Sequence, residues 1–183
     1  MNIYIVRHGT TVWNQKGISQ GHSQNRLSES GKQLVIQTAN KHKDTKFDII
    51  FCSPLMRTIQ TANIINKFHN VKIIKDRRII EIDQGIFTGR KVSTLTEQER
   101  QQKKLRSKSC KMESWQSVHN RAKLFLEDIL QNCQFENILI VTHSYVATCL
   151  ENIIVGKKVD YSNYIDKPNF ANAELRKYVL SKI

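Results

Sequence analysis

Two arginines and two histidines of this 183-residue sequence follow short apolar segments, at positions that suit phosphate chemistry. Arg7 and His8 come directly after the first apolar segment. Arg57 follows the second segment closely, and His143 directly follows a later one. Two guanidinium groups fit a phosphoryl dianion, because each offers paired N–H donors to its oxygens. Two histidines beside the same anion can act as nucleophile and as donor, since histidine can form a covalent intermediate.

A carboxylic acid is also needed in such a site, to protonate the departing alcohol of a phosphate ester. Glu81 is the preferred candidate because it lies in a loop that follows a predicted strand, and Asp83 is the alternative. Gly9 lets the backbone turn sharply next to His8. Asn14 adds a polar side chain close by.

The apolar segments predict the strands of a sheet that would position these side chains. We expect strands over residues 3–6, 47–52, 71–74 and 137–142, and a last one over 174–180. Ligands bind beyond the carboxyl ends of the strands in open α/β sheets. The two arginines and two histidines would therefore meet at one edge of the sheet.

Helical spacing of apolar residues predicts helices between the strands, over residues 29–42, 54–68, 114–131 and 145–155. Ser28 and Ser114 are predicted N-caps. Ser53 followed by Pro54 predicts the start of the second helix, whose free N–H groups would favour an anion. The alternation of strands and helices predicts a single α/β domain over residues 1–183, with a mainly parallel central sheet flanked by helices.

The overall charge points to anionic partners, because 29 lysines and arginines against 16 acidic residues give a net charge of +13. Phosphate esters, nucleic acid and acidic surfaces all fit this charge. No apolar stretch is long enough to span a membrane and no signal peptide is visible, so we expect a cytoplasmic protein without a membrane partner. The four cysteines are widely spaced, which is typical of reduced thiols and predicts no metal site.

Five motifs give the sequence a resemblance to a known family. They are RHGTTVWN from Arg7, QG from Gln20, SPLMRTIQTA from Ser53, EIDQGIFTG from Glu81 and VTHS from Val141. Together they resemble the histidine phosphatase superfamily, also called the phosphoglycerate mutase-like family, in order and in approximate spacing. They cover most of the chain, so the resemblance implies the fold of that family throughout.

The resemblance implies that His8 attacks phosphorus and becomes a phosphohistidine. Glu81 would protonate the leaving oxygen and then activate the water that releases phosphate. Arg7, Arg57 and His143 would hold the phosphoryl oxygens and stabilise their charge in the transition state. No metal and no cofactor would be required.

Further positions of the motifs imply contacts with the substrate. Asn14 would add a hydrogen bond to the phosphoryl group, and Gln20, Gly21 and Ser144 are candidate substrate-binding residues. Ser144 stands where the family usually has glycine, so it would either narrow the pocket or add a hydroxyl near the phosphate. Ile18 stands where relatives often carry a cation.

The residues between the Glu81 motif and the later helix form the lid over the site in this family, and we expect a lid insertion at about 91–113. Phosphoglycerate mutases of the family carry a longer insertion, so the short lid favours a phosphatase. The stretch 100–111 contains six cations and no acid. It is either a solvated face or a cap that attracts a highly anionic substrate.

The resemblance therefore implies a metal-independent phosphomonoester hydrolase that acts on a small phosphorylated metabolite through a phosphohistidine. Cofactor-dependent phosphoglycerate mutase, α-ribazole phosphatase-like enzyme and phosphoprotein phosphatase remain alternatives. A nucleic-acid-binding module on the same fold is an alternative from another class. We do not expect it despite the basic charge, because every residue that the chemistry needs is present. The sequence identifies neither the substrate nor the oligomeric state.

Overall fold

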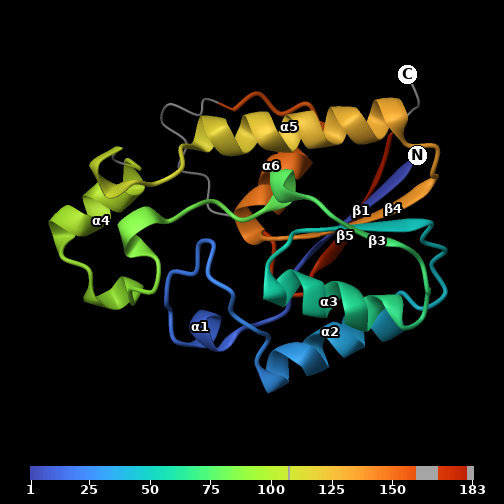
Figure 1. The fold of residues 1–183 in the computed structure, drawn as a ribbon, viewed down its shortest axis with the longest axis horizontal. Coiled ribbons are helices and arrows are strands. Elements are labelled where there is room, and N and C mark those ends of the chain that lie inside the picture. The colour runs from blue at the N-terminus through green and yellow to red at the C-terminus, as the bar shows by residue number, and fades with distance from the viewer. Residues whose placement is uncertain (107, 160–168, 181–183) are drawn as a thin grey trace.

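The apolar segments form one five-stranded sheet in the computed structural model, which describes residues 1–106, 108–159 and 169–180 (Figure 1). The strands lie in the order β3-β2-β4-β1-β5, and β5 is the antiparallel one. Their bounds are β1 Asn2–Arg7, β2 Ile49–Cys52, β3 Ile73–Lys75, β4 Asn137–Thr142 and β5 Leu175–Val179. The predicted α/β class with a mainly parallel sheet is therefore confirmed.

Helices cover both faces of this sheet, α2 and α3 on one and α5 and α6 on the other (Figure 1). The helices span α1 Val12–Gln15, α2 Glu29–Lys41, α3 Met56–Asn66, α4 Glu97–Lys104, α5 Trp115–Asn132 and α6 Ser144–Ile154. Side chains alternate between the two faces of a strand, so β1 contributes apolar side chains to the cores on both faces of the sheet. Ile3 and Ile5 pack with α5 and α6, whereas Tyr4 and Val6 pack with α2 and α3. This burial on both faces explains why the strands read as continuous apolar runs.

The segment between β3 and α5 forms a small layer with an apolar core of its own. In Figure 1, α4 lies beyond one end of the sheet, at the same end of the molecule as α1. Its core consists of Phe87, Leu95, Cys110 and Met112. Short 3₁₀ turns span Arg77–Ile79, Gly85–Phe87, Val92–Thr94 and Lys108–Cys110. The described part of the predicted lid segment 91–113 thus consists of one short helix between turns.

Several element boundaries differ from the predicted ones by one or two residues. β3 begins at Ile73, although the sequence predicts a strand from residue 71. Val71 instead exchanges two hydrogen bonds of 2.9 Å with the side chain of Asn66, which ties it to the end of α3. A local side chain has thereby replaced the neighbouring strand as the partner of that backbone.

Within the described ranges, each helix is too short or too polar to cross a membrane. The four cysteines carry free thiols. Cys52 and Cys149 are buried in the two main cores, as their apolar neighbours predict.

We expect Gly31→Ala to destabilise the protein, because a Cβ at this position would lie 1.9 Å from the carbonyl oxygen of Thr10. Glycine-to-alanine changes inside a helix otherwise stabilise by about 0.5–1 kcal/mol. The clash with backbone should reverse that sign and cost about 2 kcal/mol of the free energy of unfolding in urea. Gln37→Ala, at an exposed position of the same helix, is the control. A Gly31→Ala protein at least as stable as wild type would contradict this packing.

Candidate active site

The carboxyl ends of β1, β4 and β2 are adjacent, because these strands are parallel neighbours in the sheet. The first residues beyond them are His8, His143 and Ser53. The ring centroids of His8 and His143 lie 5.2 Å apart. His143 Nε2 lies 2.7 Å from the hydroxyl of Ser53. Strand order alone thus brings two histidines together from opposite ends of the sequence.

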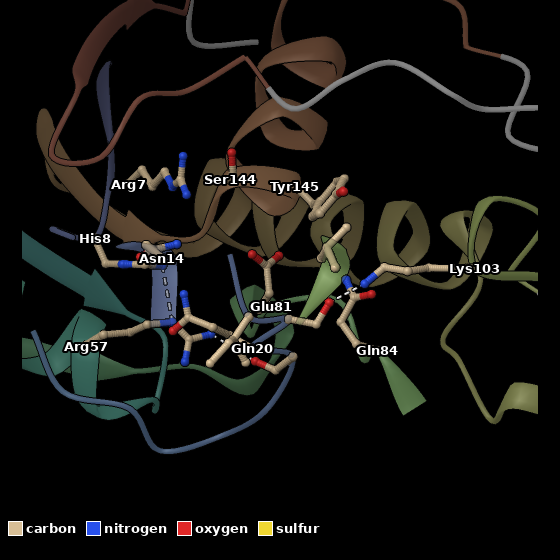
Figure 2. A pocket seen from close by; sticks show the side chains of 14 residues that line it. Arg7, His8, Asn14, Gln20, Arg57, Glu81, Gln84, Lys103, Ser144 and Tyr145 are labelled. Carbon is tan, nitrogen blue, oxygen red and sulfur yellow. Dashed lines mark hydrogen bonds between the residues drawn. The ribbon is translucent and has the colours of Figure 1, made fainter. Parts of the chain in front are cut away.

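A pocket of about 350 Å³ opens at this edge of the sheet (Figure 2). Its lining is Arg7, His8, Asn14, Ile18, Ser19, Gln20, Gly21, Arg57, Glu81, Gln84, Val92, Lys103, Ser144 and Tyr145. Two of the site residues that the sequence suggests lie outside this set: the alternative acid Asp83, and His143, which is fully buried beside His8. The pocket therefore gathers side chains from strand ends, from the loop after α1 and from α4.

One hydrogen bond fixes how His8 faces the pocket. Its Nδ1 lies 2.7 Å from the carbonyl oxygen of Gly9, which can only accept, so Nδ1 carries the proton. The other ring nitrogen, Nε2, keeps its lone pair and accepts a 3.2 Å hydrogen bond from Arg57 Nε. Burial, assisted by Arg57 and Arg7, holds the pKa of His8 well below its ordinary value. At neutral pH His8 is therefore an uncharged imidazole, and the lone pair on Nε2 is engaged by Arg57 Nε.

Arg57 is fully buried and joins the loop after α1 to the site. Its Nη1 donates to the carbonyl oxygen of Ser23 at 2.8 Å, and its Nη2 donates to that of Gly21 at 2.9 Å. Burial lowers its pKa to about 10, so it stays a cation at neutral pH. The backbone of the loop thus holds a desolvated positive charge against His8.

The C-terminal segment 169–173 closes the site behind the end of β1. The carbonyl oxygen of Phe170 accepts from Arg7 Nη1 at 2.7 Å, and Asn172 Nδ2 donates to the carbonyl oxygen of His8 at 3.0 Å. Arg7 Nε is buried without a partner among the described residues.

Ser53 does not cap α3, although the sequence predicts a helix start at Ser53 and Pro54. The helix begins at Met56, and its N-cap residue Leu55 makes no side-chain cap. The hydroxyl of Ser53 is bound to His143 instead, and Gln24 Oε1 accepts from the N–H of Met56 at 3.0 Å. The predicted cap is wrong because the side chain positions a histidine of the site.

Glu81 lies near the centre of the pocket, between the His8 end and the α4 end (Figure 2). Burial raises its pKa, while the cations Arg57 and Arg7 and the N–H of Ile82, which donates to Oε1 at 3.0 Å, act in the opposite sense. A raised pKa suits a carboxyl that must give up a proton near neutral pH. Asp83, the alternative acid, accepts from the N–H of Gly85 at 2.9 Å and is not part of the pocket lining.

Arg121 of α5 holds the backbone that carries Glu81, a role that the sequence does not predict. Its guanidinium donates to the carbonyl oxygen of Ile80 and, at 3.2 Å, to that of Glu81. The carboxylate of Glu113 accepts hydrogen bonds from Arg121 Nε at 2.9 Å and from Arg121 Nη2 at 3.0 Å. His22 Nε2 lies 2.7 Å from the same Glu81 carbonyl oxygen. Two separate elements therefore fix the main chain of the acid.

Asn14 and Gln20 both line the pocket, and the side chains of both contact Thr11, the N-cap residue of α1. The Thr11 hydroxyl lies 3.0 Å from Asn14 Oδ1 and 3.0 Å from Gln20 Oε1. Asn14 Oδ1 also accepts from the N–H of Thr11, which completes the helix cap. Because their oxygens are engaged in this way, the amide nitrogens of both side chains are the groups that a ligand would meet. Gly21 offers its carbonyl oxygen to Arg57, as described above.

Ser144 begins α6 directly after His143 and is 5% exposed. Its hydroxyl donates at 3.3 Å to the carbonyl oxygen of Phe170, which also binds Arg7. Ser144 is not among the described residues with a positive φ, so serine fits here without strain. Its hydroxyl thus supports the C-terminal segment through the carbonyl oxygen that also holds Arg7.

The part of the lining farthest from His8 contains polar side chains that the sequence does not identify. Gln84, Lys103 and Tyr145 surround this end of the pocket (Figure 2). Gln84 belongs to the Glu81 motif, but a motif does not show which of its side chains turn inward. Lys103 is one of six cations in a basic stretch, and only the path of α4 distinguishes it from the others.

In the part of the chain that the structure describes, no three histidine, cysteine, aspartate or glutamate side chains are grouped as metal ligands would be. The charged groups that face the pocket are Arg7, Arg57, Lys103 and Glu81. The site is thus built from guanidinium, ammonium, imidazole and carboxyl groups, which can bind and transfer a phosphoryl group.

Comparison with known proteins agrees with this chemistry. The sequence profile of the histidine phosphatase superfamily (branch 1) matches residues 3–180. The chain belongs to the histidine phosphatase superfamily. The resemblance carried by the five motifs is therefore confirmed, and the protein is an enzyme of this phosphatase superfamily.

Relatives within the superfamily carry different names. A protein of Escherichia coli O1:K1 named "Probable phosphoglycerate mutase GpmB" is 32% identical over 162 residues, covering 85% of this chain and 75% of that protein. The structure of YhfR from Bacillus stearothermophilus superposes with a TM-score of 0.86 at 21% identity, over 98% of this chain and 91% of that one. The α-ribazole phosphatase from Shigella flexneri superposes with a TM-score of 0.76 at 24% identity, over 86% and 81%. The two structural likenesses confirm the fold.

We expect Arg121→Lys to slow the hydrolysis of alkyl phosphates by about tenfold, because a lysine cannot bridge the carbonyl oxygens of Ile80 and Glu81 through which Arg121 holds Glu81 in place. Hydrolysis of p-nitrophenyl phosphate should be affected much less, since its leaving group needs little protonation. Arg77→Lys, an exposed position near the same loop, is the matched control. Equal slowing of both substrate types would show that Arg121 supports the fold and does not position the acid.

Proposed function

We propose that the protein is a metal-independent phosphomonoester hydrolase that acts on a small phosphorylated metabolite through a phosphohistidine on His8. The observation that carries the proposal is the neutral His8, which lines a pocket together with Arg7 and Arg57 and whose Nε2 lone pair accepts a hydrogen bond from Arg57 Nε. A nucleophile beside two cations suits the attack on a phosphate dianion, because the cations reduce the repulsion between the lone pair and the phosphoryl oxygens.

In the first step, His8 Nε2 attacks phosphorus, and the bond from phosphorus to the ester oxygen breaks. Glu81 gives its proton to that oxygen, so the product leaves as a neutral alcohol. Arg7, Arg57 and Asn14 bind the phosphoryl oxygens during the transfer. His143, which is held by Ser53 and has its Nδ1 without a partner in the described chain, would support the same oxygens.

In the second step, a water molecule attacks the phosphorus of the phosphohistidine. The Glu81 carboxylate takes a proton from this water, and the bond from phosphorus to Nε2 breaks. Inorganic phosphate leaves, and both His8 and Glu81 return to their starting protonation states. The arginines keep their protons throughout, so the cycle balances without a metal ion.

The segment at about 91–113, which contains α4, is proposed as a short lid over the leaving group. Val92 and Lys103 of this segment line the pocket, which supports the assignment. A short lid favours the hydrolase, since water must reach the phosphohistidine.

A phosphoglycerate mutase is the second candidate, because the E. coli relative at 32% identity carries that name. A mutase would return the phosphoryl group to a second hydroxyl. Conversion of 3-phosphoglycerate in the presence of bisphosphoglycerate, at a rate above that of phosphate release, would favour it.

We expect His8→Ala to abolish phosphate release from a panel of phosphate monoesters, measured with a chelator present. Loss of the nucleophile should reduce kcat by at least about 10³-fold. His42→Ala, in the loop that follows α2, is the control and should keep wild-type activity. Near-native turnover by the His8 variant would rule out the phosphohistidine.

We expect Glu81→Gln to discriminate between leaving groups, because the amide cannot donate the proton that an alkoxide needs. Hydrolysis of alkyl phosphates should fall by about 10²-fold or more. For p-nitrophenyl phosphate, the rate of the first step, the transfer of the phosphoryl group to His8, should fall by less. In the wild type, the rate with alkyl phosphates should fall as pH rises through the raised pKa of Glu81, since the acid form is then lost. A variant that slows only esters with good leaving groups would refute this assignment.

A further inference from the structure

Lys103 reaches the pocket from α4, on the side opposite His8 and Arg57 (Figure 2). Its ammonium group donates a hydrogen bond to the hydroxyl of Ser19 and lies 5.6 Å from the ring centroid of Phe87. These contacts hold a half-buried lysine with its charge directed into the cavity. The adjacent Lys104 is exposed on the same helix.

The charge of Lys103 is not balanced within the described chain. Among residues 1–106, 108–159 and 169–180, no carboxylate forms an ion pair with it. Burial, with a contribution from Arg106, lowers its pKa to about 8. A desolvated ammonium without a counter-ion is costly, so an anionic group beside it would be favourable.

The charges of the pocket can be divided between its two ends. Arg7 and Arg57 lie at the His8 end, where two guanidinium groups match a phosphoryl dianion. Glu81 is the one acid in the lining, and its raised pKa favours the neutral form. Lys103 therefore remains as a cation that the phosphoryl group does not neutralise.

The same end of the pocket contains an unmatched acceptor. Gln84 is 6% exposed, and its Oε1 is buried without a partner in the described chain. Gln84 lines the pocket beside Lys103, so this end of the lining combines a cation with an amide side chain.

On the basis of the proposed function, we infer that the physiological substrate carries a second acidic group, a carboxylate or a second phosphate, and that Lys103 binds it. The phosphoryl group to be transferred lies against His8 and the arginines, and the leaving group spans the pocket past Glu81 and Gln84. Lys103 is a specificity-determining residue in this arrangement, because it acts on the leaving group and not on the transferred phosphoryl group.

The test compares two phosphonates, which bind like phosphate esters but cannot be hydrolysed. 4-Phosphonobutyrate and 4-hydroxybutylphosphonate share the phosphonate head and the carbon chain, and differ in a terminal carboxylate or hydroxyl. A second pair, one carbon shorter, tests a shorter distance between the phosphonate and the terminal group. Dissociation constants are measured by calorimetry for the wild type, Lys103→Met, Lys103→Arg and the matched control Lys104→Met.

We expect the wild type to bind the carboxylate member of at least one pair about fivefold or more tightly than the hydroxyl member, as a charge-assisted hydrogen bond would provide. This ratio should fall to near one in Lys103→Met and should persist in Lys104→Met. Lys103→Arg keeps the charge and should retain most of the preference. A ratio is insensitive to the fraction of folded protein, so partial loss of folding does not obscure the result.

Two results would overturn the inference: a wild-type ratio near one for both pairs, or a preference that survives in Lys103→Met. Failure of both phosphonates to bind the wild type would overturn it as well. Phosphate release from p-nitrophenyl phosphate by the same preparations tests the proposed function separately. A preserved preference without release would contradict the hydrolase alone, whereas release without a preference would contradict the anionic subsite alone.

Discussion

The hydrogen bond from His8 Nδ1 to the carbonyl oxygen of Gly9 is the interaction on which the site depends. It fixes the tautomer, so the nitrogen that faces the pocket is the one with a lone pair. The carbonyl is placed by Gly9, where a Cβ would lie 2.5 Å from Val35 Cγ2 and 2.7 Å from the carbonyl oxygen of Gly31. The close approach of α2 to this turn thus determines the chemistry of the imidazole that precedes it.

The surrounding charges then act on a histidine that is already oriented. Arg57 is buried by its bonds to the carbonyl oxygens of Gly21 and Ser23, and Arg7 is held by that of Phe170. Backbone carbonyls accept from these guanidinium groups without neutralising their net charge. The positive potential is therefore available to an anionic group, and burial together with this potential lowers the pKa of His8 and keeps it uncharged.

The sequence predicts those features of the fold and of the site that follow from the positions of strand ends and from the periodicity of apolar residues. Parallel strands that end in Arg7 and His143 must meet at one edge, and the apolar face of α5 around Phe125 is buried as its spacing predicts. Long-range partners are not predictable in this way. Ser53 resembles a helix cap because the histidine that binds it lies 90 residues later. Lys103 resembles its exposed neighbours because only the path of α4 turns it inward.

The measurement that tests the account most directly is the protonation state of His8 in solution. Two-bond ¹⁵N–¹H correlation spectra of protein labelled at its six histidines report the tautomer of each ring, and a His8→Gln variant identifies the signal. The account predicts a neutral ring with the proton on Nδ1 that stays neutral as pH falls through about 6.5, the ordinary histidine value. An imidazolium at neutral pH, or a neutral ring protonated on Nε2, would contradict it.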